Sequence, residues 1–163
     1  MQRFRLLAFL LTLPLCATAI AQDDSKTSTP EERQHWVAVL HKLEAQPSNP
    51  ETISEAEHVV KRLIMVEDVH IKMCDVISEL PSNYSQKEPI LQMFMIGLAA
   101  YQVETGKTDG EGSNLYALHS VLKGYTSILA ADPKAQDKKL DNLAKMDEEG
   151  KLPQMIKKKK GCN

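Results

Sequence analysis

The stretch EPILQMFMIGLAAYQVET, residues 88–105, decides the fold. Between Ile90 and Tyr101 it is apolar on nearly every side of a helix, a pattern typical of a helix buried at the centre of a protein. Spanning a bilayer takes about 20 apolar residues, more than this stretch provides. Gly97, Ala99 and Ala100 carry little side-chain bulk, so a neighbouring helix can approach closely. We therefore expect residues 88–105 to form the central helix of a bundle.

Helical patterns continue on both sides of this stretch. Five further segments have helical periodicity or helix-capping signals: residues 30–45, 50–80, 114–132, 134–149 and a short segment from residue 153. Residues 50–80 carry apolar side chains at alternating spacings of three and four, which predicts one long helix or two collinear helices. No segment alternates with period two. The sequence thus predicts an all-α, single-domain bundle of five or six antiparallel helices.

Two of the expected boundaries rest on capping signals. Thr29-Pro30-Glu31-Glu32 combines an N-cap, a proline at the first helical position and a capping-box glutamate, so a helix should start at Pro30. Residues 106–113 contain three glycines and several charges, which predicts a flexible loop. Asn114 would then cap the helix that follows this loop.

One hairpin of the expected helices resembles a known family. The residues IGLAAY at 96–101 and VLKGYTSILAADP at 121–133 resemble the two helices of a tetratricopeptide repeat, above all in the terminal aromatic, aliphatic and Asp-Pro pattern. The segment from Gly97 to Pro133 is about a dozen residues longer than that family's spacing, and Val121 stands where the family has a small residue. The resemblance implies a bundle that is tetratricopeptide-like in part, with a groove that binds protein segments.

The N-terminus has the three parts of a secretory signal peptide. Arg3 and Arg5 precede a leucine-rich stretch at residues 6–15, and Ala19-Ile20-Ala21 supplies the small residues before a cleavage site. We predict a cleaved signal peptide at residues 1–21, a disordered polar leader at 22–29, and a helical domain with a basic tail at 30–163. The expected location is periplasmic or secreted, with no integral membrane span.

The formal charge of −2 is the sum of two opposite parts. Residues 22–132 contain 9 basic and 17 acidic side chains, a charge of −8, whereas residues 133–163 contain 9 basic and 5 acidic ones, a charge of +4. The acidic body argues against nucleic acid as a partner. The tail carries the run Lys157, Lys158, Lys159 and Lys160, which can make weak contact with an anionic surface. We favour a tail that keeps the protein in solution or that neutralises the acidic body.

Two cysteines, Cys74 and Cys162, remain once Cys16 leaves with the signal peptide. An exported chain meets an oxidising compartment, so we expect these two to form one disulfide. In the chain-entropy model a loop of this length contributes roughly 4 to 5 kcal/mol to stability. Because Cys162 is the penultimate residue, the bridge would hold the lysine run near Cys74.

The sequence offers few residues for chemistry. His70 and Cys74 are four apart on the expected long helix, but His70 falls on the packing seam, and we interpret it as a hydrogen-bonded core histidine. Met93 and Met95 are two apart and would point to different faces of a helix, which disfavours a copper site. There is no hydrolase elbow and no phosphate-binding loop. We therefore predict no cofactor and no enzymatic activity.

These observations favour an exported, non-enzymatic helical protein that acts as a protein–protein interaction module through an acidic surface. An inhibitor or immunity protein that covers a basic partner is a narrower form of this hypothesis. The alternative is a periplasmic carrier of a small ligand or metal, with a pocket around His70 and Tyr101.

Overall fold

A computed structural model describes residues 26–162, and within them every regular element is a helix. The α-helices are α1 Pro30–Ala45, α2 Pro50–Met65, α3 Lys87–Thr105, α4 Gly110–Ala131, α5 Lys138–Glu148 and α6 Leu152–Lys157, with a 3-10 helix η1 Asp75–Glu79 before α3. The all-α prediction is confirmed. None of the helices in this part of the chain is both long and apolar enough to cross a membrane. The expected signal peptide, residues 1–21, lies outside the described residues.

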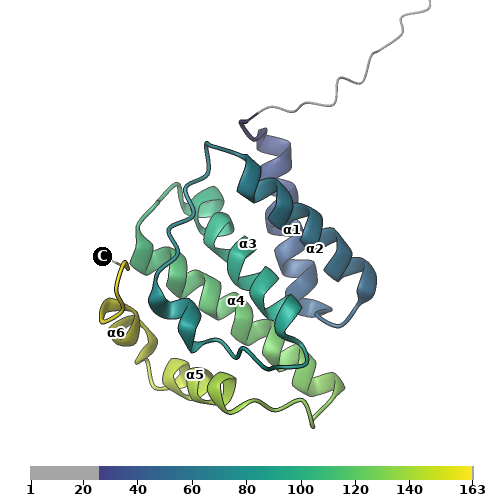
Figure 1. Cartoon of the computed structure of the whole chain (residues 1–163), viewed down its shortest axis with the longest axis vertical. Coiled ribbons are helices and arrows are strands. Elements are labelled where there is room, and N and C mark those ends of the chain that lie inside the picture. The colour runs from purple at the N-terminus through teal and green to yellow at the C-terminus, as the bar shows by residue number, and fades with distance from the viewer. Residues whose placement is uncertain (1–25, 163) are drawn as a thin grey trace, which may run out of the picture.

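α3 and α4 lie side by side at the centre of the molecule and share its most extensive helix–helix contact (Figure 1). α1 packs on both of them, α2 packs on α1 and α3, and α5 and α6 pack on α4. The largest fully buried side chains are Trp36, Leu40, Leu43, Ile90, Met93, Phe94, Ile96, Leu98, Leu118, Ile128, Leu140 and Leu143. Since α3 supplies five of these, the expectation that it is the central, most buried helix is confirmed.

Gly97 brings the backbones of the two central helices together. A methyl group added to Gly97 would lie 2.9 Å from the Cα of Ala117 on α4 and 3.3 Å from its Cβ. Ala117 is itself fully buried, so neither helix has room to yield. The missing side chain at Gly97 therefore sets how closely α3 and α4 approach.

α1 begins where the sequence predicts, with both halves of a capping box. The Thr29 hydroxyl accepts a hydrogen bond from the Glu32 amide at 3.2 Å, and the Glu32 carboxylate accepts one from the Thr29 amide at 3.0 Å. Pro30 occupies the first turn, where a backbone N–H has no partner within the helix, so the lack of an N–H in proline costs no hydrogen bond.

The residues just before α1 are held in place by Asp68. The amide and hydroxyl of Ser28 donate to its carboxylate at 3.0 and 2.9 Å, and Arg33 Nη2 lies 2.6 Å from its Oδ2. The expectation of a disordered leader is therefore wrong for residues 26–29. Its first part, residues 22–25, lies outside the described residues.

α2 ends at Met65, well before the expected end at Leu80, and residues 66–74 continue without helical structure. The Glu67 amide, which a continuing helix would bond to Leu63, instead donates to the Lys26 carbonyl at 2.7 Å. Val66 of the predicted seam is nevertheless buried, and so is Val69, which is not part of it, so apolar side chains reach the core from an irregular segment; Met73 of the seam is 40% exposed. The prediction of one long helix or two collinear helices over residues 50–80 is wrong, because a spacing of three and four does not require helical backbone.

The interpretation of His70 as a core histidine is wrong for the same reason. Its side chain is exposed, and its backbone amide donates to Gln102 Oε1 at 3.0 Å. Because residues 70–74 are not helical, His70 and Cys74 do not share a helical face.

α4 begins at Gly110, so the expected loop over residues 106–113 is too long and Asn114 is not a cap. Asp109 caps the helix instead: its Oδ1 accepts from the Gly112 amide at 2.6 Å. Asn114 is buried inside the first turns, where its Nδ2 donates to the carbonyls of Lys72 and Gly110, each at 2.8 Å. The side chain thereby ties the irregular segment to α4.

α5 also starts later than expected, at Lys138 instead of residue 134. The Asp137 carboxylate caps it by accepting from the amides of Lys139 and Leu140, at 2.9 and 3.2 Å. Leu140 and Leu143 are its buried residues. Gly150, with φ of 65°, follows the end of the helix as expected.

We expect Gly97→Ala to lower the free energy of unfolding by about 1–3 kcal/mol, because its new methyl group meets the backbone of a buried helix. The higher helix propensity of alanine relative to glycine acts in the opposite direction, by about 1 kcal/mol. Gly124→Ala on α4 is the comparison variant, since its methyl group would meet the end of the buried Met93 side chain, whereas the nearest backbone atom of a neighbouring helix, Glu44 Cα, is 3.9 Å away. Urea denaturation of both variants measures the difference. Equal stabilities would contradict the close-approach interpretation.

The pH dependence of stability tests the Asp68 anchor. Burial raises the pKa of Asp68, but hydrogen bonds from Arg33 and Ser28 outweigh burial and hold the pKa below its usual value of 3.8. The ionised carboxylate therefore stabilises the fold above the unfolded pKa, and this contribution disappears as pH falls through the folded pKa. We expect Asp68→Asn to lower stability at pH 7 and to flatten its decline in acid. Denaturation curves between about pH 2 and pH 7 measure both effects; parallel profiles for variant and wild type would exclude the anchor.

Candidate functional site

The two cysteines form the disulfide that the sequence predicts. Cys74 and Cys162 are bonded to each other with their Cα atoms 5.1 Å apart, and both are buried. Next to the bridge, the Asp75 amide donates to the Lys160 carbonyl at 3.1 Å. The C-terminal residues are therefore fixed against the irregular segment before α3.

The lysine run lies on the surface beside this bridge, and two of its members pair with the acidic body. Lys157 Nζ lies 3.4 Å from Glu111 Oε1, and Lys159 forms an ion pair with Glu79. Lys158 and Lys160 are exposed. The neutralising role that we favour for the tail agrees with these pairs.

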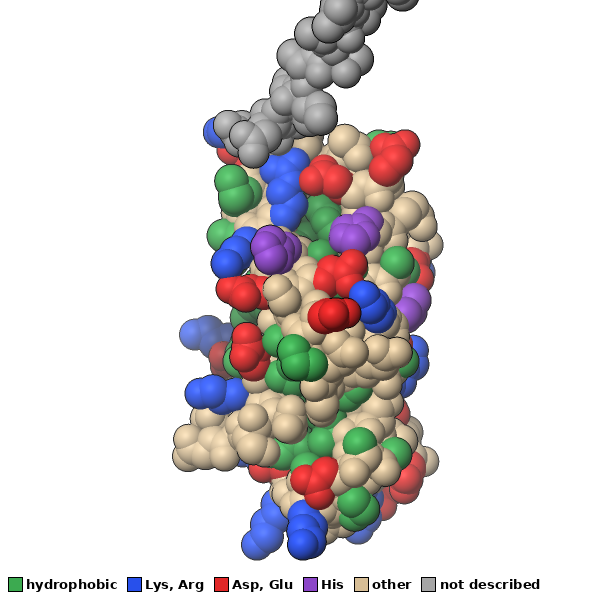
Figure 2. Space-filling view, turned by 90° about the vertical axis from the view of Figure 1, so that its right-hand side faces the viewer, with side chains coloured by type: hydrophobic (Ala, Val, Ile, Leu, Met, Phe, Trp, Pro, Cys, Tyr) green, Lys and Arg blue, Asp and Glu red, His purple; other side chains and the backbone are tan. Residues whose placement is uncertain are grey.

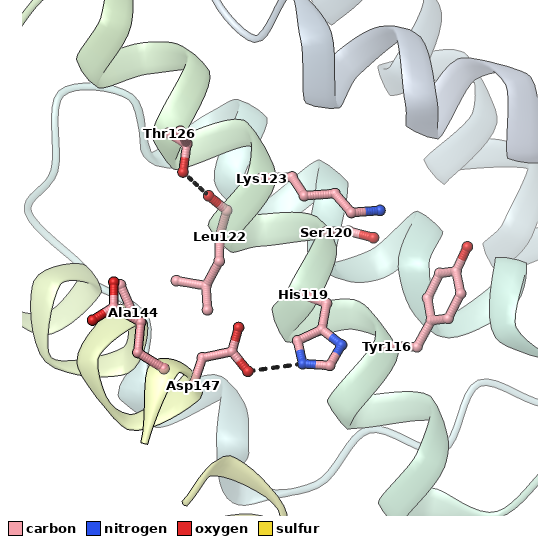
Figure 3. Close-up of a pocket in the computed structure, with 9 residues that line it drawn as sticks. Tyr116, His119, Ser120, Leu122, Lys123, Thr126, Ala144 and Asp147 are labelled. Carbon is pink, nitrogen blue, oxygen red and sulfur yellow. Dashed lines mark hydrogen bonds and ion pairs between the residues drawn. The ribbon is translucent and has the colours of Figure 1, made fainter. Parts of the chain in front are cut away.

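A cleft of about 480 Å³ lies between α4 and α5 (Figure 3). It is lined by Tyr116, His119, Ser120, Leu122, Lys123, Thr126, Ala144, Asp147 and Glu148. His119 Nε2 on α4 lies 3.0 Å from Asp147 Oδ1 on α5, so this pair joins the two walls. Three polar side chains of α4, namely Lys123, Ser120 and Tyr116, point away from Asp147, toward the other side of the helix (Figure 3).

Two carboxylates stand on that other side. Lys123 Nζ lies 3.5 Å from Glu44 Oε2 of α1, and the Tyr116 hydroxyl donates to Glu104 Oε2 of α3 at 2.7 Å. The His41 ring lies between the carboxylates, with Nδ1 3.1 Å from Glu44 Oε2 and Nε2 3.8 Å from Glu104 Oε1. We call His41, Glu44, Glu104, Tyr116 and Lys123 the carboxylate cluster.

Glu44 is the buried member of this cluster. Its side chain is 9% exposed, and its Oε1 has no hydrogen-bond partner among the described residues. A buried acceptor without a donor costs free energy, because it has lost its water without a replacement. Burial raises the pKa of Tyr116, and the hydrogen bond to Glu104 raises it further, so the phenol stays protonated and remains a donor. The cluster is thus a partly buried site with more acceptors than donors.

A second depression, of about 370 Å³, lies between α2 and α3 and is lined by Val60, Lys87, Glu88, Leu91, Gln92 and Met95. Val60 and Ile64 are four apart on α2, and Leu91 and Met95 are four apart on α3, so each helix presents an apolar ridge. Ile64 is 72% exposed, and Met65 beside it is 61% exposed. We call Val60, Ile64, Leu91 and Met95 the apolar groove.

The side of the molecule on which α1 and α2 lie carries mixed charge. In Figure 2 acidic, basic and histidine side chains lie next to one another, and the apolar areas between them are small and separate. The pairs include Lys42 with Glu55 at 2.7 Å and Lys61 with Glu57 at 2.6 Å. Exposed pairs of this kind contribute about 0–1 kcal/mol, and we assign no site to them.

The residues of the carrier hypothesis do not form a metal centre. Within residues 26–162 no group of three or more His, Cys, Asp or Glu side chains is placed to hold a metal ion. His70 is exposed, Cys74 is in the disulfide, and the Tyr101 hydroxyl donates to Asp109 Oδ2 at 2.6 Å. A pocket around His70 and Tyr101 gains no support from these positions.

Sequence reasoning missed both surfaces, although each leaves a signal. Glu44 follows Trp36 and Leu40 at a spacing of four, so it continues the buried stripe of α1. A carboxylate in such a position is unusual, because charged side chains are seldom buried without partners. On α2, Ile64 and Met65 are adjacent, and one helix cannot bury both on the same stripe.

Comparison of the chain with protein-family models, with curated protein sequences and with solved structures finds no match. The resemblance to a tetratricopeptide repeat stays a prediction.

We expect replacement of both bridge cysteines, Cys74→Ala with Cys162→Ala, to lower the free energy of unfolding by about 3–5 kcal/mol. The bridge limits the unfolded chain, and its loss also frees the tail that it holds. Urea denaturation with and without reductant measures the effect: reductant should destabilise the wild type and leave the double variant unchanged. Detection of two free thiols in the native protein by alkylation and mass spectrometry would contradict the disulfide.

Proposed function

We propose that this chain is an exported, non-enzymatic module that binds another protein by receiving an amphipathic helix in the apolar groove. The observation that carries the proposal is the exposure of large apolar side chains along the groove: Leu91, which lines it, is 38% exposed, and Ile64, one turn after Val60 on α2, is 72% exposed. Covering a large apolar side chain contributes roughly 1.5–3 kcal/mol.

The shape of the groove suits a helix. Its two ridges place apolar side chains four residues apart on α2 and on α3, and an amphipathic helix presents anchors at the same spacing. The lining is mainly apolar along the groove, and its charged residues, Lys87 and Glu88, lie at the start of α3. A partner helix can therefore bury its apolar face and keep its polar face in water.

Charge favours a basic partner. α2 and α3 together carry five acidic and three basic side chains, and residues 22–132 as a whole have a charge of −8. Complementary charge speeds association and selects among partners. An inhibitor or immunity protein that covers a basic toxin or hydrolase is the narrower form of this proposal.

The proposed location is periplasmic or secreted. The Cys74–Cys162 disulfide supports an oxidising compartment, which agrees with the signal peptide predicted at residues 1–21. Contact of the lysine run with an anionic surface is a weaker proposal, because Lys157 and Lys159 already pair with the chain's own carboxylates.

Site-specific photo-crosslinking in the native host tests the proposed function. A photoreactive residue in place of Leu91 should give one stoichiometric adduct with a second protein, because Leu91 lines the groove. The same residue at the exposed position 145 of α5 is the control and should give none. The partner is then purified, and we expect Leu91→Glu to weaken its affinity at least about tenfold, while Lys145→Glu leaves it unchanged.

Three results would overturn the proposal: no adduct at Leu91, equal adducts at both positions, or equal affinity of the purified partner for wild type and Leu91→Glu. An adduct between two copies of this chain would show self-association and would also overturn it.

A further inference from the structure

The carboxylate cluster has an acceptor that the described residues leave unused. The carboxylate of Glu44 lies where α1 faces α4, and its Oε2 is approached by His41 Nδ1 at 3.1 Å and Lys123 Nζ at 3.5 Å. Its Oε1 is buried and has no donor. The Glu44 carboxylate is about nine-tenths buried, and one of its oxygens accepts no hydrogen bond from the described residues. Such a group is suited to a ligand that brings N–H donors.

Among the described residues Lys123 is the cation that pairs with Glu44, and it is easily displaced. Lys123 approaches at 3.5 Å, which is long for a charged hydrogen bond, and its side chain is 61% exposed. Swinging Lys123 into water would therefore open the way to Glu44 at little cost. The departing ammonium leaves two carboxylates, Glu44 and Glu104, on either side of His41.

We propose that the carboxylate cluster binds a guanidinium group, which takes the place of Lys123 beside Glu44 and also faces Glu104. This site is separate from the apolar groove and does not depend on the function proposed for it. The guanidinium comes either from a free small molecule or from an arginine side chain of another protein.

The residues of the cluster favour a guanidinium over other cations. A metal ion needs three or more converging ligands, and within residues 26–162 no group of His, Cys, Asp or Glu side chains is placed to hold one; in the cluster His41 stands between Glu44 and Glu104. An ammonium is a compact charge that keeps its water, whereas a guanidinium is planar, weakly hydrated and carries five donors in a fork. Its fork can pair with Glu44 at the place of Lys123, while Glu104, on the other side of His41, adds negative charge. The Tyr116 ring stands beside them, and guanidinium planes stack on aromatic rings.

Titration of the ¹⁵N-labelled, disulfide-bonded chain with methylguanidinium, followed by NMR, tests the proposal. We expect saturable shifts of the amides of Glu44, Glu104 and Lys123. Glu44→Gln should weaken binding at least about tenfold, because it removes the buried charge while keeping the shape. Lys123→Ala should tighten binding about threefold, because it removes the competing cation.

Glu57→Gln is the matched control, since it removes an equal charge from an exposed pair on α2 and should leave binding unchanged. Lys123→Ala keeps the test decisive if Glu44→Gln fails to fold, because Lys123 is a surface residue. Absence of saturable binding, weaker binding by Lys123→Ala, or an equal loss in Glu57→Gln overturns the proposal. Equal affinity for methylammonium overturns the choice of a guanidinium.

A second titration, with a short peptide containing one arginine, separates the two sources of the group. Binding of the peptide at least about tenfold tighter than methylguanidinium indicates an arginine of a partner protein, since contacts beyond the side chain then contribute. Equal or weaker binding of the peptide indicates a free small molecule. In both cases the Glu44→Gln loss must persist.

Discussion

The close approach of α3 to α4 at Gly97 is the contact on which the rest of the structure depends. With no side chain at Gly97, the backbone of α3 lies against Ala117, and about half of the residues of each of the two helices are buried. A helix that is apolar on nearly all sides must be covered on most of them. α1, α2, α5 and α6 supply that cover, and each needs only an amphipathic stripe to do so.

The segment between α2 and α3 cannot rely on helix packing, because within it only η1 is regular. It is held instead by contacts with distant parts of the chain, which include the following three. Asp68 binds the residues before α1, the Asn114 side chain binds the Lys72 carbonyl, and Cys74 is bonded to Cys162. These contacts bring the start and the end of the described chain to one irregular segment, so the fold is closed by polar and covalent links as well as by its core.

The sequence predicts those parts of the fold that local physics determines. Three features each allow one favourable structure. They are the capping box at Thr29, the apolar character of α3 on nearly all sides, and the two cysteines that remain to pair with each other. The end of α2 cannot be predicted in this way, because the Glu67 amide donates to the carbonyl of Lys26, which is far away in sequence. At the start of α4 two caps compete, and Asp109 prevails over Asn114 because the latter is needed in the core. Tertiary partners decided both cases.

The two candidate surfaces lie at different ends of α3, and this bears on whether they can influence each other. Leu91 and Met95 of the apolar groove are in its first half, while Glu104 of the carboxylate cluster is in its last turn. Coupling between them would require an element with two arrangements, such as an α3 that slides or turns. Gly97, between the two surfaces, is pressed against Ala117 with no space for a second arrangement. We infer that groove and cluster act independently: occupation of one leaves the affinity of the other unchanged, because the helix that joins them is fixed at its middle.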